Sequence, residues 1–447
     1  VIVIKEHMET LRFKTLGALG LAVFLFTAAD AAKADERYKL TDSVSAGMSI
    51  RERYEVKDDF RFDNTDPKND DNYLLSQIRL NLQWKPAETV TVFVEGQDAR
   101  AAGEETFSDS STPNIYADDF DLHQGYVDIQ SSAEAPEASA RVGRQKLLYG
   151  QQRLVGPLEW VNTARVFDAA KVTVGDIKGR SVDLFSSRAV GVDPGGPNDW
   201  DKSGSRYANS DFHGVYFTDK TMIEKGVIEA YYLFRHEDTA SDRVSTLGTR
   251  VVVPTCEQLT VDGEFAWQFG DFGGMTHRAF AVHAGLTMLV DEDTATSVNG
   301  QYNFASGDGD STDSTHETFD NLYPTNHALY GYMDFFSWQN LHNIELSANR
   351  DIVSGLTLRV AWNGFWLAEA DSDSWYNAGL GAVRSAGGTD VSSFVGHELD
   401  ITLKYPFLEK RLWAELGYSH FFTGSYISDT GSSNDADFFY SQLKFAI

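Results

Sequence analysis

Basic side chains recur on one face of strand-like stretches in this 447-residue chain, and an anion is the partner that they suit best. Arg79, for example, stands between Ile78 and Leu80. Neighbouring side chains in a strand point to opposite faces, so such a residue lies on the face away from the apolar side chains. The same pattern applies to Arg51, Arg53, Arg79, Arg359 and Lys404. An arginine held on a wall presents a forked pair of donors that matches a carboxylate.

Acidic residues on similar stretches support an alternative interpretation of these arginines. The relevant carboxylates are Glu52, Glu55, Glu264 and Glu398. If each arginine is neutralised by a carboxylate on a neighbouring strand, the polar face is a wall of paired charges with a structural role.

The segment 143–168 differs from the other connecting segments, because it is basic where they are acidic. It reads GRQKLLYGQQRLVGPLEWVNTARVFD and contributes Arg144, Arg153 and Arg165. Strict alternation breaks near Arg144, so the facing of that side chain is open. We expect the segment to fold inward and form a constriction, with an ordinary outer loop as the alternative.

Two other groups contain residue types that can bind metal or perform catalysis. Asp308, Asp310 and Asp313 could bind a calcium ion loosely, although the full EF-hand pattern is absent. No other cofactor is expected. Ser419 and His420 are adjacent on a predicted strand and therefore point to opposite faces, which excludes a nucleophile–base pair between them. We do not expect an enzyme.

Alternation of apolar and polar residues with a period of two continues through almost the whole chain and predicts about eighteen strands, with sixteen as the alternative count. The polar face carries charges at strand centres, which suits a watery lumen inside an apolar outer band. The predicted strands are residues 38–54, 73–85, 88–100, 119–131, 137–149, 166–175, 180–188, 211–219, 226–236, 243–253, 259–269, 277–289, 294–304, 339–350, 355–368, 394–405, 410–422 and 436–447.

The connections between these strands alternate in length. Short ones at 85–88, 176–179, 254–258, 351–355 and 406–410 alternate with long, mostly Asp- and Gly-rich ones. Short periplasmic turns and long outer loops are typical of transmembrane β-barrels, and an even strand count places both ends in the periplasm. The sequence therefore predicts an all-β antiparallel transmembrane barrel. The last strand must pair with the first, because lipid tolerates no open sheet edge.

Composition limits the remaining classes. The formal charge of -28 argues against nucleic-acid binding, which needs basic surfaces. Cys256 is the only cysteine, so an internal disulfide is impossible. Arg12 and Lys14 precede an apolar run, and small residues follow it, which predicts a signal peptide at 1–34 with Met8 as an alternative start and a single barrel domain at 35–447.

The segment 143–168 resembles the most recognisable block of the alginate-export family of outer-membrane barrels. Further matches are RERYE at 51–55, LYPTNH at 322–327, GYMD at 331–334, GHELD at 396–400 and GYSHFF at 417–422. The resemblance implies an eighteen-stranded barrel whose arginine-rich constriction passes an anionic uronate polysaccharide outward. The basic positions that match are Arg79, Arg144, Arg153, Arg165 and Arg359.

The sequence thus favours an outer-membrane channel that passes an acidic polysaccharide or oligosaccharide passively along an arginine-lined lumen. Two alternatives remain open: a general or anion-preferring porin for small solutes, and a surface-binding barrel with a closed lumen. The expected partners are outer-membrane lipid, the anionic polysaccharide and periplasmic secretion proteins. The expected pathway residues are Arg51, Arg53, Arg79, Arg144, Arg153, Arg165, Arg359 and Lys404.

Overall fold

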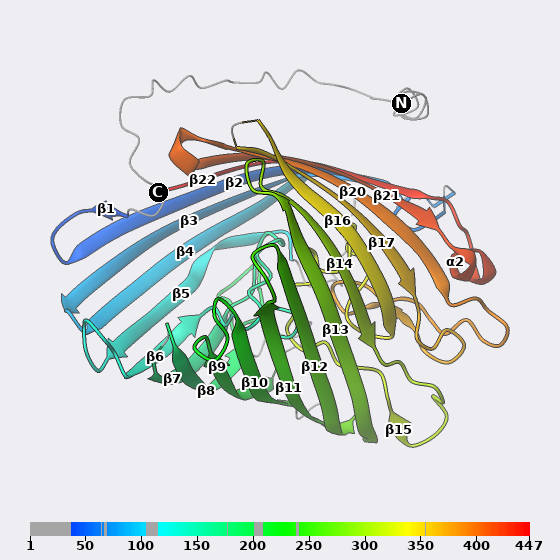
Figure 1. The fold of residues 1–447 in the computed structure, drawn as a ribbon, viewed down its shortest axis with the longest axis horizontal. Helices are drawn as coiled ribbons and strands as arrows, with labels where there is room; N and C mark the ends of the chain where they lie inside the picture. The colour runs from blue at the N-terminus through cyan, green and yellow to red at the C-terminus, as the bar shows by residue number, and fades with distance from the viewer. Residues whose placement is uncertain are drawn as a thin grey trace. The chain divides into compact units, whose positions relative to one another are not determined.

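Eighteen long antiparallel strands in the described part of the chain form a closed barrel (Figure 1). The computed structural model describes residues 37–447 except 64, 67, 68, 104–114, 177, 201–208, 238–240 and 354. The predicted signal peptide lies outside the described residues and stays a prediction. The described helices are too short and too polar to span a bilayer.

Each barrel strand pairs with its neighbour along the chain, and the last strand returns to the first. The closing pair joins β2 to β22 in a register that runs from Ser49 opposite Ala446 to Asp58 opposite Asp437. The barrel strands are β2 (Val44–Asp58), β3 (Asp71–Ala87), β4 (Val90–Gly103), β5 (Asp118–Gln130), β6 (Ala138–Gln145), β7 (Phe167–Gly175), β8 (Arg180–Ala189), β9 (Ser210–Asp219), β10 (Val227–Glu237), β11 (Asp242–Pro254), β12 (Leu259–Phe272), β13 (Met275–Asp291), β14 (Thr296–Ala305), β16 (Leu341–Val353), β17 (Leu356–Trp366), β20 (Phe394–Phe407), β21 (Leu412–Thr423) and β22 (Ala436–Ala446). The predicted count and closure are therefore confirmed.

Short pieces of regular structure lie between or beside the barrel strands. They are β1 (Tyr38–Lys39), β15 (Thr315–His316), β18 (Trp375–Tyr376), β19 (Ala382–Arg384), a 3-10 turn at Leu408–Lys410 and α2 (Ser425–Thr430). The C-terminal strand ends beside the start of β2, at the end of the barrel where the short turns lie (Figure 1).

Two predicted boundaries were wrong. The strand predicted at 38–54 is interrupted, because the chain turns at residues 40–43 and β1 folds back on β2, with Tyr38 opposite Ala46. A hydrogen bond from the Val44 amide to the Thr41 hydroxyl, at 3.0 Å, closes this turn. The strand predicted at 137–149 ends at Gln145, because the chain leaves the wall there and enters the barrel.

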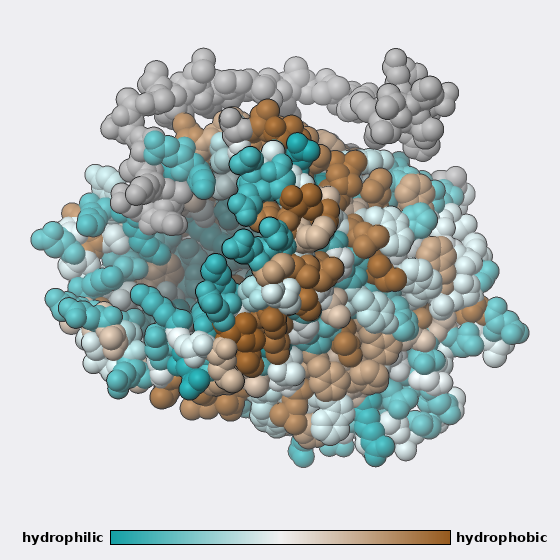
Figure 2. Space-filling model, viewed as in Figure 1, coloured by the Kyte–Doolittle hydropathy of each residue, from teal (hydrophilic) through white to brown (hydrophobic). Residues whose placement is uncertain are grey.

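Alternation along each strand separates an apolar outer face from a polar inner face. On β3, Leu82 is 53% exposed on the outside, whereas Arg79 is 6% exposed on the inside. Hydrophobic residues gather on the strand wall over β13 to β16, and hydrophilic residues border them (Figure 2). An outer apolar band of this kind is what a barrel needs to stand in lipid.

Long loops pack inside the barrel and contribute an aromatic core at the long-loop end. Phe62, Phe336, Trp375 and Phe421 come from three loops and one strand, and each is at most 1% exposed. Phe336 stacks on Phe365 of β17 with ring centroids 3.8 Å apart. This packing holds the loops against the inner wall on the side of β17 to β22.

Candidate permeation pathway

The segment between β6 and β7 lies inside the barrel along the inner wall of β2. Arg51 donates to the backbone oxygens of Glu159, at 2.6 Å, and of Val161, at 3.1 Å. Arg53 donates to the Trp160 backbone oxygen at 2.7 Å. Both arginines are less than 7% exposed, so their guanidinium groups fasten this inward segment to the wall.

Uncharged amides extend the same attachment to the walls of β3 and β4. Gln77 donates to the Asn162 backbone oxygen at 2.6 Å, and Gln97 donates to that of Thr163 at 2.8 Å. The Asn162 side chain donates in turn to the backbone oxygen of Ser76 at 3.0 Å. Every one of these contacts joins residues at least 66 positions apart in the sequence.

A second inward segment, between β14 and β16, crosses the barrel beside the first. Its Asp320 carboxylate pairs with Arg235 of β10 at 3.0 Å. Tyr323 forms a parallel bridge with Val155 of the first segment. At its far side the Met333 amide donates to the Glu398 carboxylate of β20 at 3.0 Å. The two segments therefore support one another within the lumen.

Aromatic and cationic groups from the two inward segments and from two wall strands, β2 and β17, form one stack. The Arg53 guanidinium lies 3.7 Å from the ring centroid of Trp160. Trp160 stacks on His327 with centroids 3.6 Å apart, and His327 stacks on Tyr332 at 4.8 Å. Arg359 lies 5.5 Å from the Tyr332 ring. This luminal stack joins β2 to β17 through both inward segments.

The carboxylate of Glu159 lies among cations. Arg79 donates to one of its oxygens at 2.8 Å, and Lys146 contacts the other at 2.5 Å. Lys444 lies opposite Arg51 in the closing strand pair, on the same inner face. Burial alone would raise the pKa of Glu159, but Arg79 and Lys146 outweigh it and hold that pKa far below its ordinary value. We call Arg79 and Lys146 the carboxylate cradle.

Arg153 and Arg165 contact protein groups inside the lumen. Arg153 pairs with Glu264 of β12 at 3.3 Å and contacts Nε2 of His283 at 2.9 Å. Arg165 donates to the backbone oxygen of Pro324 at 2.9 Å. Both therefore connect the inward segments to each other or to the wall.

Arg359 and Lys404 lie on the inner wall of neighbouring strands. Arg359 pairs with Glu345 at 2.6 Å. Lys404 is 3.9 Å from Glu415, and its side chain is 51% exposed. Among the predicted residues in the described chain, Lys404 is thus the cation most available to a solute.

Arg144 lies on the outer face, which corrects its place among the predicted pathway residues. It shares its face with the exposed Val142 and pairs with Asp168 of β7 at 2.8 Å. Above the apolar band, outward positions are polar, so polarity no longer reveals which way a side chain points. Glu52 is a second example, since its outward carboxylate accepts from Ser76 at 2.6 Å.

Sequence reasoning missed both the cradle's occupant and the stack. Glu159 and His327 lie within the segments that carry the family resemblance, but no spacing in the sequence pairs them with residues so distant in the chain. The predicted calcium ligands take part in local turns: Asp310 accepts from Thr312 at 2.6 Å, and Asp313 accepts from the Thr315 amide at 2.6 Å. Within the described residues, no group of three or more His, Cys, Asp or Glu side chains is placed to hold a metal ion.

Comparison with known proteins places the fold in a family. The chain matches the family described as "Alginate export" over residues 42–441. No curated protein matches the chain. Among solved structures it is similar to Pseudomonas aeruginosa OccD3 (OpdP), with a TM-score of 0.62, 12% identity and coverage of 94% of this chain and 95% of that one.

Two further Pseudomonas aeruginosa structures show the same fold. OccK8 (OprE) has a TM-score of 0.60 and 14% identity, with 90% of this chain and 98% of that chain covered. OccK3 (OpdO) has a TM-score of 0.59 and 16% identity, with 91% and 96% covered. At these sequence identities, the similarity supports a shared fold alone. The family match over nearly the whole chain goes further: this chain belongs to the alginate export family and is a porin-like β-barrel of the bacterial outer membrane.

Proposed function

We propose that this barrel is a passive channel for an anionic polysaccharide or acidic oligosaccharide of the uronate type. The observation that carries the proposal is the carboxylate cradle. Arg79 and Lys146 already bind one carboxylate, that of Glu159, inside the lumen. A carboxylate on a sugar ring has the same charge and the same two oxygens, so the geometry that holds Glu159 also suits the cargo.

Exchange of carboxylates gives a mechanism for movement. The Glu159 side chain is 40% exposed, so an arriving carboxylate can reach the cradle from the lumen. Competition between the internal and the arriving carboxylate keeps net binding weak. Weak binding at successive positions allows a charged solute both to enter and to leave. Lys404, which is half exposed on the same inner wall, supplies another such position.

A general or anion-preferring porin for small solutes is the second candidate, and the pairing of luminal arginines favours it. Arg153 pairs with Glu264, Arg250 with Glu229 and Arg359 with Glu345. Such pairs cancel charge along the wall and leave little to select a polymer. A surface-binding barrel with a closed lumen is the third candidate, favoured by the two segments that cross the barrel.

Planar-bilayer recordings of the purified barrel separate the three candidates. Oligouronates are added to each side in turn, and uncharged oligosaccharides of equal length serve as the control. A polysaccharide channel shows anion preference and oligouronate block that weakens in Arg79→Gln/Lys146→Gln. Open conductance without block supports the small-solute porin, and almost no conductance supports the closed barrel; either result contradicts the proposal.

A further inference from the structure

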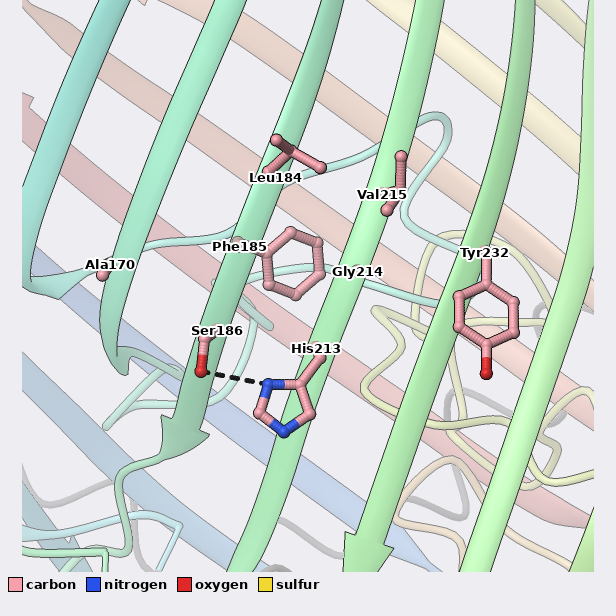
Figure 3. A pocket seen from close by; sticks show the side chains of 8 residues that line it. All are labelled: Ala170, Leu184, Phe185, Ser186, His213, Gly214, Val215 and Tyr232. Carbon is pink, nitrogen blue, oxygen red and sulfur yellow. Dashed lines mark hydrogen bonds between the residues drawn. The ribbon is translucent and has the colours of Figure 1, made fainter.

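Two grooves on the outer surface of the barrel share an arrangement that transport through the lumen does not use. The first lies across β7 to β10 and has a volume of about 420 Å³ (Figure 3). Its apolar floor includes Leu184, Val215 and Tyr232, which are exposed on the outer face. Their strand neighbours Phe185 and Leu233 are buried on the inner side of the wall. The groove therefore opens toward lipid.

The second groove lies at the long-loop end of β12 to β16 and has a volume of about 430 Å³. Trp267, Phe280 and Phe304 supply its aromatic floor, and Arg278 and His342 supply cationic or ionisable nitrogen. Aromatic side chains at this height are typical of the interface between hydrocarbon and headgroups.

A histidine borders each groove, and its orientation is the same in both. His213 Nδ1 lies 3.0 Å from the Ser186 hydroxyl, as Figure 3 shows, and His342 Nδ1 lies 2.7 Å from the Tyr302 hydroxyl. In the part of the chain that the structure describes, neither Nε2 has a hydrogen-bond partner. Each ring is thus fixed through one nitrogen and offers the other.

Both histidines lie near the ends of strands that meet the long loops. His213 is the fourth residue of β9, after the connection from β8, and His342 is the second residue of β16. Long loops mark the outer side of such barrels. The grooves therefore face the outer leaflet, where apolar chains and phosphate groups of the same molecule meet.

We propose that both grooves bind the phosphorylated glycolipid of the outer leaflet. An acyl chain fills the apolar floor, and a phosphate oxygen meets Nε2 of His213 or His342. If the Ser186 or Tyr302 hydroxyl donates to Nδ1, the neutral ring carries its hydrogen on Nε2, where a phosphate oxygen can accept it. In the second groove Arg278 adds a permanent charge.

The charges near each groove determine which of the two should bind a phosphate more tightly. Two residues along the strands from Ser186 and His213, Arg188 pairs with Asp211, and on β6 and β7 Arg144 pairs with Asp168, so these charges nearly cancel. The second groove is lined by Glu317 and Glu369 as well as by Arg278. Its two carboxylates oppose a phosphate. We therefore expect the first groove to bind more tightly.

The test measures lipid retention by native mass spectrometry on the full barrel at neutral pH. Three lipids are supplied separately: the phosphorylated outer-leaflet glycolipid, the same glycolipid without phosphate, and phosphatidylglycerol. We expect the first to be retained about fivefold to tenfold more than the others, as one hydrogen bond to a charged phosphate would give. Equal retention of the dephosphorylated glycolipid, or of phosphatidylglycerol, overturns the proposal.

Variants locate the binding independently of the lipid comparison. His213→Gln and His342→Gln keep a group that can hydrogen-bond Ser186 and Tyr302, so the wall is preserved. We expect His213→Gln to lose most of the preference for the phosphorylated glycolipid. His397→Gln is the matched control, because His397 is an outward histidine that lines neither groove. An equal loss of lipid preference in His397→Gln would show that the lipid is retained by the outer surface in general, which contradicts the two groove sites.

Discussion

Replacing Glu159 by glutamine tests whether the carboxylate cradle belongs to the transport pathway. The change keeps the shape of the side chain but removes the charge that Arg79 and Lys146 hold at 2.8 and 2.5 Å. With the internal competitor reduced to a neutral amide, an oligouronate carboxylate binds Arg79 and Lys146 against weaker competition. We therefore expect Glu159→Gln to be blocked at lower oligouronate concentration than the unmodified barrel.

The magnitude follows from the two lost contacts. A hydrogen bond to a charged group contributes about 1.5–3 kcal/mol when buried. Glu159 is 40% exposed, so solvent screens its pairs and lowers the difference to about 1–2 kcal/mol in total. Since about 1.4 kcal/mol corresponds to a factor of ten, the blocking concentration should fall by about fivefold to thirtyfold.

The assay is block of single-channel current by a defined oligouronate, with Glu95→Gln as the control. Glu95 is buried on the inner wall of β4 and accepts from Gln124 at 2.9 Å. Its replacement changes luminal charge by the same amount without removing the carboxylate from the cradle. If both variants shift the block equally, total charge explains the effect and the cradle assignment is wrong. A Glu159→Gln barrel with unchanged block would also refute the reasoning.

Three further outcomes are expected. Because the pKa of Glu159 is depressed, its ion pairs stabilise the inward segment above about pH 4.5 and lose that contribution as the pH falls toward the depressed value. Conductance recorded against pH should therefore be steady down to about pH 4.5 and rise below it. Glu159→Gln should abolish this rise. Trp160→Leu removes the stack with His327 and the contact with Arg53, which should destabilise the inward segments by about 1–3 kcal/mol; larger and noisier single-channel conductance checks this, and unchanged conductance would exclude the stack as a barrier. Arg144→Gln alters an outward ion pair only, so reversal-potential measurements should show unchanged ion selectivity.

Strand positions were predictable because one physical constraint repeats in every strand. A wall between lipid and water requires alternation, and a strand such as β13, with Phe280 and Leu286 outside and His277 and His283 inside, displays it in its sequence. The closing pair of β2 and β22 followed from the same constraint, because an open edge in lipid leaves backbone groups unpaired.

The inward segments were harder to predict, because their contacts are long-range and involve backbone oxygens. Arg51 recognises the carbonyl groups of Glu159 and Val161, which any residue would supply. The basic composition of 143–168 indicated an unusual loop, yet composition does not identify the strand on which a loop rests. The prediction for Arg144 was wrong for a different reason. The alternation of apolar and polar residues shows which face a side chain occupies only inside the apolar band.

Net charge is a poor guide to selectivity in this barrel. The chain carries a formal charge of -28, which alone would argue against the passage of polyanions. Much of that charge lies in loops, and several luminal carboxylates are paired with arginine, as Glu264 is with Arg153 and Glu345 is with Arg359. A solute in the lumen experiences charges within about 8–10 Å, because salt screens the rest. The local balance around Glu159, with two direct cation contacts on one carboxylate, is therefore the quantity that selectivity should follow. Moving that carboxylate, rather than changing the total charge of the chain, should alter what passes.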